Sequence, residues 1–127
     1  HMVIPARLIP DSRLAAPLSL LTASVVTFYT APDRSASTEK TRAYIRRLTL
    51  TNTSAVDETV TIYLVPRGDT AGAANMLVSA LSVPAGKTAV VREAEGHILE
   101  PGGTIQAVKG AAPGSAVTIM ASGVEFR

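Results

Sequence analysis

The stretch that decides the fold reads RAYIRRLTLTN (42–52), TSAVD (53–57) and ETVTIYLV (58–65). In its two long parts the apolar residues recur at every second position, at Leu48, Leu50, Val60, Ile62 and Leu64. Alternation of this length is typical of half-buried antiparallel β-strands joined by a short polar connection. We therefore expect a hairpin in which Leu48 faces Ile62 and Leu50 faces Val60, with further strands packed around it.

This register creates a problem at Arg46, which would lie on the core side opposite Leu64. A buried guanidinium without a partner is too costly to tolerate. Either Arg46 lies at the open end of the sheet, or a β-bulge near residues 45–47 turns it outward and brings Ile45 into the core. We favour the bulge, because Ile45 would otherwise face solvent.

Turn signals divide the rest of the chain into further short strands. The expected strands span 23–30, 76–83, 88–93, 104–108 and 116–122. About seven or eight short strands at this spacing predict an all-β fold, an antiparallel β-sandwich of the jelly-roll or immunoglobulin-like type. Alternation does not specify strand order, so both types stay open. We assign residues 23–127 to this single β-sandwich domain.

Residues 1–22 differ from the rest of the chain. His1-Met2 is interpreted as a tag remnant, and the segment after it is an extended arm interrupted by three prolines. The apolar side chains of this arm need a surface to lie on. Either the arm packs along its own domain as an edge strand, or it reaches onto a neighbouring subunit. In the second case the contact residues are Leu8, Ile9, Leu14, Leu18, Leu20 and Leu21.

Positive charge gathers at one end of the expected hairpin, at Arg42, Arg46 and Arg47. These arginines are either solvated and paired with carboxylates such as Glu39 or Glu58, or they form a contact for an acidic partner surface. The two alternatives differ in whether the charge is already neutralised within the chain.

Composition excludes several classes of function. The net charge is only +2, and the chain has three tyrosines, two phenylalanines and no tryptophan. A nucleic-acid binder normally shows a basic stripe with stacking aromatic residues, so we expect no nucleic-acid partner. There is no cysteine for a disulfide or a thiolate metal site. No apolar run reaches the roughly 20 residues of a membrane helix, and no secretory signal is expected.

One local cluster of titratable residues deserves a catalytic hypothesis, namely Glu93, Glu95, His97 and Glu100. It is either a solvated loop, or a cation site or carboxylate–histidine pair. The aspartate-rich spacing of calcium loops and the Gly-x-Ser-x-Gly elbow of serine hydrolases are both absent. We therefore expect no enzyme activity, no cofactor and no metal.

Five short motifs follow one another along the chain. They are Tyr29-Thr-Ala-Pro32, Thr51-Asn-Thr53, Pro66-Arg-Gly68, Leu99-Glu-Pro-Gly-Gly-Thr-Ile105 and Ser122-Gly-Val-Glu125. With their flanking strands they resemble small virion proteins of tailed bacteriophages and prophages over most of residues 23–127. One departure is Gly103, where such chains often carry aspartate, so this position supplies no carboxylate.

The resemblance implies a non-enzymatic structural protein, either a capsid-decorating (cement) protein or a head–tail joining (collar) subunit. It implies self-association as a trimer or ring, and contact with virion proteins such as the major capsid protein or the connector. It also implies synthesis in the cytoplasm of a bacterial host and a final location in the virion. It offers no catalytic residues to carry over.

The alternative is a β-sandwich binding module for a carbohydrate or protein ligand. A sugar-binding module needs exposed aromatic rings for stacking, and the available tyrosines are Tyr29, Tyr44 and Tyr63. Burial of these rings would disfavour this alternative.

Overall fold

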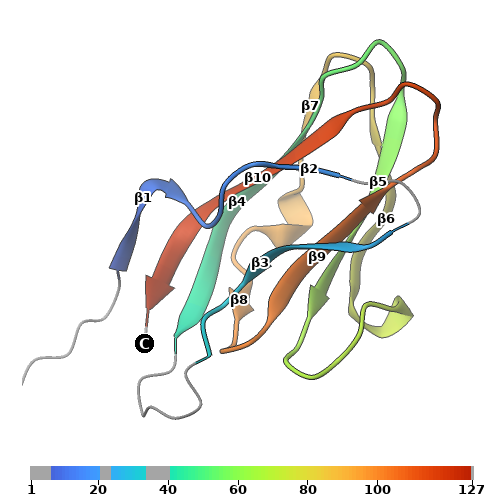
Figure 1. The fold of residues 1–127 in the computed structure, drawn as a ribbon. Helices are drawn as coiled ribbons and strands as arrows, with labels where there is room; N and C mark the ends of the chain where they lie inside the picture. The colour runs from blue at the N-terminus through green and yellow to red at the C-terminus, as the bar shows by residue number, and fades with distance from the viewer. Residues whose placement is uncertain (1–6, 21–23, 34–40, 127) are drawn as a thin grey trace, which may run out of the picture.

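The computed structural model describes residues 7–20, 24–33 and 41–126, with the backbone alone for residues 7–12 (Figure 1). The strands are β1 (Arg7–Arg13), β2 (Leu18–Ser19), β3 (Val26–Thr30), β4 (Arg42–Asn52), β5 (Glu58–Val65), β6 (Met76–Val83), β7 (Thr88–Val90), β8 (Ile98–Leu99), β9 (Thr104–Lys109) and β10 (Val117–Phe126). Two short 3₁₀ helices are η1 (Ala73–Asn75) and η2 (Arg92–Ala94). Neither helix of this described part is long and apolar enough to span a membrane.

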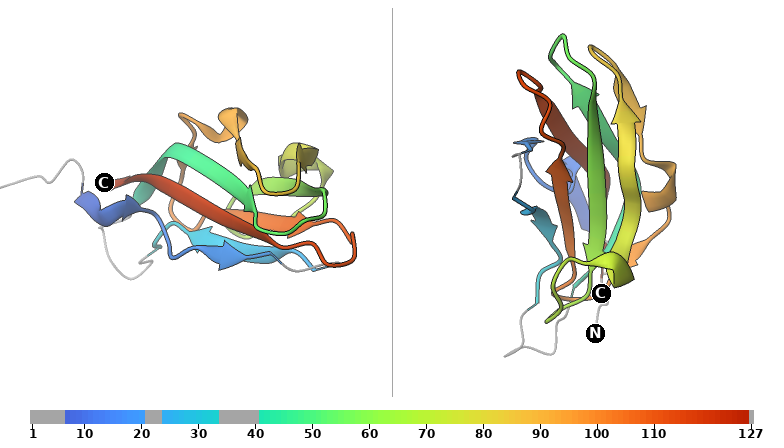
Figure 2. Two further views of the ribbon diagram at one scale, coloured as in Figure 1. Left: turned by 90° about the horizontal axis from the view of Figure 1, so that it is seen from above. Right: turned by 90° about the vertical axis from the view of Figure 1, so that its right-hand side faces the viewer.

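The strands form two antiparallel sheets packed against each other (Figures 1 and 2). Sheet A has the order β1-β10-β4-β7, with β2 also paired to β10 and β8 to β4, and sheet B has the order β3-β9-β5-β6. Because β1 and β2 follow one another along β10, and β7 and β8 along β4, each pair counts as one interrupted strand. The ten strands then reduce to eight, in the orders 1-8-3-6 and 2-7-4-5. This is the strand order of a jelly roll, so the expected sandwich is confirmed and the immunoglobulin-like type is excluded.

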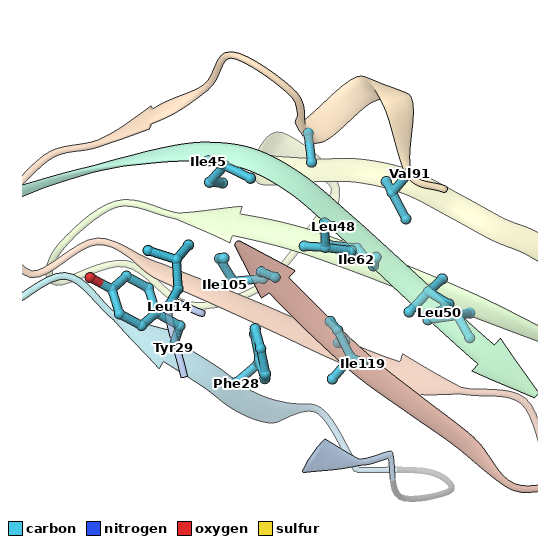
Figure 3. Close-up of a cluster of buried hydrophobic side chains, with 14 of the residues drawn as sticks. Leu14, Phe28, Tyr29, Ile45, Leu48, Leu50, Ile62, Val91, Ile105 and Ile119 are labelled. Carbon is cyan, nitrogen blue, oxygen red and sulfur yellow. The ribbon is translucent and has the colours of Figure 1, made fainter. Parts of the chain in front are cut away.

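The expected hairpin is wrong, because β4 and β5 belong to opposite sheets. β4 pairs with β10, which places Leu50 opposite Ile119, while β5 pairs with β9 and β6. Leu48 and Ile62 are both buried in the core, but they come from opposite sheets rather than from neighbouring strands (Figure 3). Alternation identifies the buried face of a strand and leaves open which other strand completes its hydrogen bonds.

The chain crosses between the sheets at a corner held by the side chain of Asn52, which is 1% exposed. Its Nδ2 donates hydrogen bonds to the carbonyl oxygens of Val56 and Val83, at 2.7 and 2.9 Å. Its Oδ1 accepts hydrogen bonds from the N–H and the hydroxyl of Ser54, at 2.9 and 2.7 Å. The amide therefore ties together backbone groups of the corner and of the end of β6.

The expected β-bulge is confirmed, although its partner strand is β10 rather than β5. Ser122 pairs with Arg47, and the next residue, Gly123, pairs with Ile45, so Arg46 is the extra residue. Ile45 is fully buried and Arg46 is exposed. The bulge removes the guanidinium from the core and restores the apolar side chain to it.

The core between the sheets is mainly aliphatic (Figure 3). Its largest fully enclosed side chains come from both sheets and are Ile45, Leu48, Leu50, Ile62, Ile105 and Ile119. Two aromatic neighbours, Phe28 and Tyr29, are both buried because the register of β3 against β9 shifts between Thr27 and Tyr29. Plain alternation along this strand would bury Phe28 together with Val26 and would leave Tyr29 on the opposite face.

The other expected strands are present with shifted ends. The segment 76–83 forms β6 as expected, and β9 and β10 extend beyond the expected segments to Lys109 and Phe126. The expected strand 88–93 is too long, because β7 ends at Val90. Val91 is fully buried and the chain then enters η2, which explains why the strand stops there.

The N-terminal arm lies on its own domain over the described residues 7–20. β1 and β2 pair with β10 of the same chain, so the first of the two alternatives for the arm describes this structure. Leu14 and Leu20 are buried in the core, at 6% and 3% exposure. The N–H groups of these two leucines also donate to the carbonyl oxygens of Ala121 and Val117 on β10. The arm is therefore an interrupted edge strand of sheet A.

A buried carboxylate closes the end of β5 and supports a pH prediction. Burial alone would raise the pKa of Glu58. The carboxylate, however, accepts hydrogen bonds from the Ser115 hydroxyl and from the N–H groups of Thr59 and Ala112. Together with the nearby charge of Lys109, these bonds hold the pKa below its usual value of 4.5. The unfolded chain therefore binds more protons than the folded chain as the pH falls below about 4.5.

We expect Glu58→Gln to lower the free energy of unfolding by about 2 kcal/mol at pH 7, because charge-assisted hydrogen bonds are lost. The difference from wild type should shrink as the pH falls through the folded-state pKa of Glu58, where the wild-type carboxylate is itself protonated. Urea unfolding followed by circular dichroism between pH 3 and 7 measures both curves. A difference that stays constant over this range would contradict the role of the carboxylate charge.

Candidate interaction face

The outer face of sheet A, the side turned away from the core, carries an exposed apolar row. Val124 of β10 pairs with Tyr44 of β4, and Tyr44 pairs with Ile98 of β8. Tyr44 is 37% exposed, Ile98 is 48% exposed and Val124 is half-buried. The three residues thus lie side by side across three strands. We call Val124, Tyr44 and Ile98 the apolar row.

Beside the apolar row, an open hollow of about 330 Å³ is lined by Arg46, Arg47, Glu95 and Ser122. The bulge builds this hollow, because it sets two successive residues of β4 against one residue of β10. Both arginines are exposed as a result. A regular strand would have placed one of them on the core side. We call this site the basic hollow.

The charges on this face are only partly compensated. The Nε of Arg42 donates to Oε1 of Glu100 at 2.7 Å, and the Nε of Arg47 is 3.8 Å from Oε2 of Glu95. Arg46 forms no ion pair within the ranges that the structure describes. The longer Arg47–Glu95 separation gives a weak surface interaction, so positive charge remains at the basic hollow.

The three predicted arginines are therefore brought to one face, but not with the carboxylates expected for them. Glu58 is the first residue of β5 and accepts a hydrogen bond from the Ser115 hydroxyl instead of pairing with these arginines. Glu39 lies outside the described residues. The carboxylates that do approach the arginines are Glu95 and Glu100, from the segment that follows β7.

The arm residues predicted as oligomer contacts do not join this face as a group. Leu14 and Leu20 belong to the core, and Leu18 is half-buried against it. Leu8 and Ile9 lie in β1, of which the backbone alone is described, and Leu21 lies outside the described residues. Two of these leucines are therefore already covered by their own chain.

The titratable cluster at residues 93–100 forms no metal site in the structure. Over the described ranges, no group of three or more histidine, aspartate or glutamate side chains could hold a metal ion. Glu95 and Glu100 turn to different arginines, at opposite sides of the apolar row. The backbone of this segment is fixed along β4, because the His97 carbonyl accepts a hydrogen bond from the Ile45 N–H. Glu95 and Glu100 are therefore held apart, although they are close in sequence.

The sequence named Tyr44 as an available ring for a binding module, but it did not predict that Tyr44 and Ile98 share a surface. The exposure of Tyr44 follows from the sequence once the bulge buries Ile45. Tyr44 lies between the buried residues Ala43 and Ile45, so alternation turns its side chain outward. Ile98 gave no such signal, because β8 has only two residues and its pairing with β4 depends on a connection that folds back through η2.

Four of the five sequence motifs contact one another, and the remaining one, Thr51-Asn-Thr53, contains the corner residue Asn52. The Tyr29 hydroxyl donates to Oε2 of Glu125 at 2.6 Å, and this bond is buried. Ala31 exchanges backbone hydrogen bonds with the turn in the motif 99–105. Its N–H donates to the Gly103 carbonyl and its carbonyl accepts from the Gly102 N–H, both at 2.8 Å.

The turn after β5 joins the same end of the sandwich. Nε of Arg67 is 2.6 Å from Oδ2 of Asp33, and the Arg67 stem lies so close to Gly102 that a Cβ there would meet it at 2.8 Å. The tripeptide Arg67-Gly-Asp69 therefore holds its arginine in an internal ion pair. Together with Asn52 at the opposite corner and Gly123 at the bulge, the motif residues act as structural links.

Comparisons of the chain with protein-family models, with curated proteins and with solved structures found no match. A functional proposal for this protein therefore depends on its residues and their geometry.

Proposed function

We propose that this protein is a non-enzymatic structural subunit of a tailed-bacteriophage virion, a capsid-decorating or head–tail joining component that self-associates. The observation that carries the proposal is the mutual contact of the motif residues that resemble such proteins. Tyr29 bonds Glu125, and Ala31 bonds the Gly102–Gly103 turn. Motifs that link strands and turns in this way specify a rigid frame, which is what an assembly subunit requires.

The strand order is compatible with the structural proposal and with the binding-module alternative. Jelly rolls occur in viral capsid domains and also in lectins, so the fold alone favours neither class. The tyrosines favour the structural proposal over a sugar-binding module. Tyr29 is buried and Tyr63 is half-buried, which leaves Tyr44 as the most exposed tyrosine ring. A single ring without a second stacking partner is a weak platform for a sugar.

The virion role is tested by looking for the chain in purified particles. Particles of the phage or induced prophage that encodes this chain are separated by density-gradient centrifugation and analysed by mass spectrometry. We expect the chain to co-purify with the major capsid protein, while an abundant host cytoplasmic protein is lost. Absence of the chain from particles that contain the other virion proteins would overturn the virion role.

Self-association is tested separately by light scattering behind a sizing column. We expect a mass of at least three chains, each of 13.2 kDa. A mass of one chain over the accessible concentration range would overturn self-association in solution. The particle experiment is independent of this result, because it asks only whether the chain is a virion component.

A further inference from the structure

We propose that the outer face of sheet A binds an acidic protein surface, with partner carboxylates in the basic hollow and partner aliphatic side chains on the apolar row. The inference rests on the proposed function in one respect: it describes how the subunit would meet another virion protein. The chemistry of the face stands on its own.

The basic hollow has the donors that a carboxylate requires. Arg46 and Arg47 are successive residues that both face outward because of the bulge, and the half-buried Ser122 lies opposite them on β10. Guanidinium groups bind carboxylates through two parallel N–H···O bonds, and a hydroxyl adds a further donor. The nearest resident carboxylate, Glu95, is 3.8 Å from Arg47, so a partner carboxylate could displace it at little cost.

The apolar row supplies the area that a charge contact alone lacks. Tyr44 and Ile98 are well exposed and adjacent, and Arg42 with its partner Glu100 lies on the far side of the row. An apolar centre bordered by polar groups is the usual anatomy of a protein–protein interface. Tyrosine and arginine are also the residues that most often carry binding energy at such interfaces.

The positive charge of the basic hollow favours an acidic partner over a second copy of this chain. A two-fold contact of this face with a second copy, centred on β4, would set the arginines of the two chains against each other, which opposes self-association here. A nucleic acid stacks its bases on several aromatic rings, and among the described residues of this face Tyr44 is the one well-exposed aromatic hydrophobic residue. A partner that alternates carboxylates with aliphatic side chains matches both parts of the face.

The experiment is a titration of the ¹⁵N-labelled protein, followed by amide chemical shifts, with the peptide acetyl-Glu-Leu-Glu-Leu-Glu-amide as probe. The matched probe replaces each glutamate by glutamine, and a single-stranded DNA oligonucleotide is the competing ligand class. We expect shifts concentrated at residues 44–47, 95–98 and 122–124 with the acidic peptide. Arg46→Glu should weaken this binding about tenfold.

Lys87→Glu is the matched control, because it makes the same change in charge at an exposed turn beyond the far end of β4. We expect it to leave the affinity unchanged, and Ile98→Ser to weaken binding without changing its dependence on salt. Equal binding of the glutamine peptide, shifts on another surface, or tighter binding of DNA to this face would each overturn the proposal. Presence of the chain in virions despite such a result would leave the proposed function intact and remove only this interface.

Discussion

Replacing Gly123 by alanine is expected to lower the free energy of unfolding by about 3 kcal/mol, because the added methyl group has no space beside β4. Gly123 lies in β10 opposite the bulge, where it pairs with Ile45. A Cβ at this position would overlap the carbonyl oxygen of Tyr44 and press on the Leu14 side chain. The carbonyl belongs to a backbone held by β10 on one side and β8 on the other, so it cannot retreat without breaking the ladder.

The measurement is urea unfolding followed by far-ultraviolet circular dichroism, with Gly72→Ala as the matched control. A Cβ at Gly72 meets no atom within 4 Å, and its backbone is extended, so this variant should be as stable as wild type. Because Gly123 maintains the bulge, any folded Gly123→Ala protein should also bind the acidic peptide more weakly. Equal stability of the two alanine variants would show that β10 can shift to accept the methyl group.

Replacing Asn52 by alanine is expected to cost about 3 kcal/mol, because four hydrogen bonds of a buried amide are lost together. Two backbone carbonyls, of Val56 and Val83, would lose a donor in a place where little water reaches. Thr53→Ala is the neighbouring control, since Thr53 is exposed and its hydroxyl makes one long bond of 3.4 Å to the Ala116 carbonyl. We expect a change below about 0.5 kcal/mol for this control.

The variant Asn52→Asp separates the hydrogen bonds from the loss of volume. It keeps the shape and the acceptor of Asn52, but it places a carboxylate against the two carbonyl oxygens that the amide had bonded. Burial and these oxygens raise the pKa of the introduced carboxyl, so the variant should be least stable at neutral pH. Its deficit relative to wild type should decrease as the pH falls from this raised folded-state pKa towards the unfolded-state value of about 3.9, because the protonated carboxyl regains one donor. A deficit independent of pH would contradict the assigned direction of the hydrogen bonds.

The sequence predicted several features because a single residue made the alternative too costly. Arg46 in a core position would have been an unpaired buried charge, so the bulge followed from physical chemistry before its partner strand was known. The alternating residues Val60 and Ile62 of the segment 58–65 likewise identified its buried face. These are local properties, set by the period of a strand and by the solvation of its side chains.

The expected hairpin between 42–52 and 58–65 failed for an equally specific reason. Its connection is short and polar, as in a hairpin, but Asn52 and Ser54 use their side chains to complete a corner instead of a turn. The Asn52 amide reaches Val83, which is distant in sequence, so no local pattern contains this information.

The candidate face likewise has features that the local sequence predicts and features that depend on the tertiary structure. Its charge was predictable, since Arg42, Arg46 and Arg47 are close in sequence. The pairing of these arginines with Glu95 and Glu100, and the assembly of the apolar row, were not predictable. Tyr44 and Ile98 become neighbours only when the segment after β7 folds back along β4.

The sequence by itself therefore determined the all-β class, the buried face of most strands and the outward arginines, because alternation and the cost of burying charge act within one strand. Only the tertiary structure decided the jelly-roll order, the place of the arm on its own domain and the face that joins the basic hollow to the apolar row. Those features depend on which strands share backbone hydrogen bonds. Every strand edge offers the same N–H and C=O groups, so that choice is made by the packing of the whole chain.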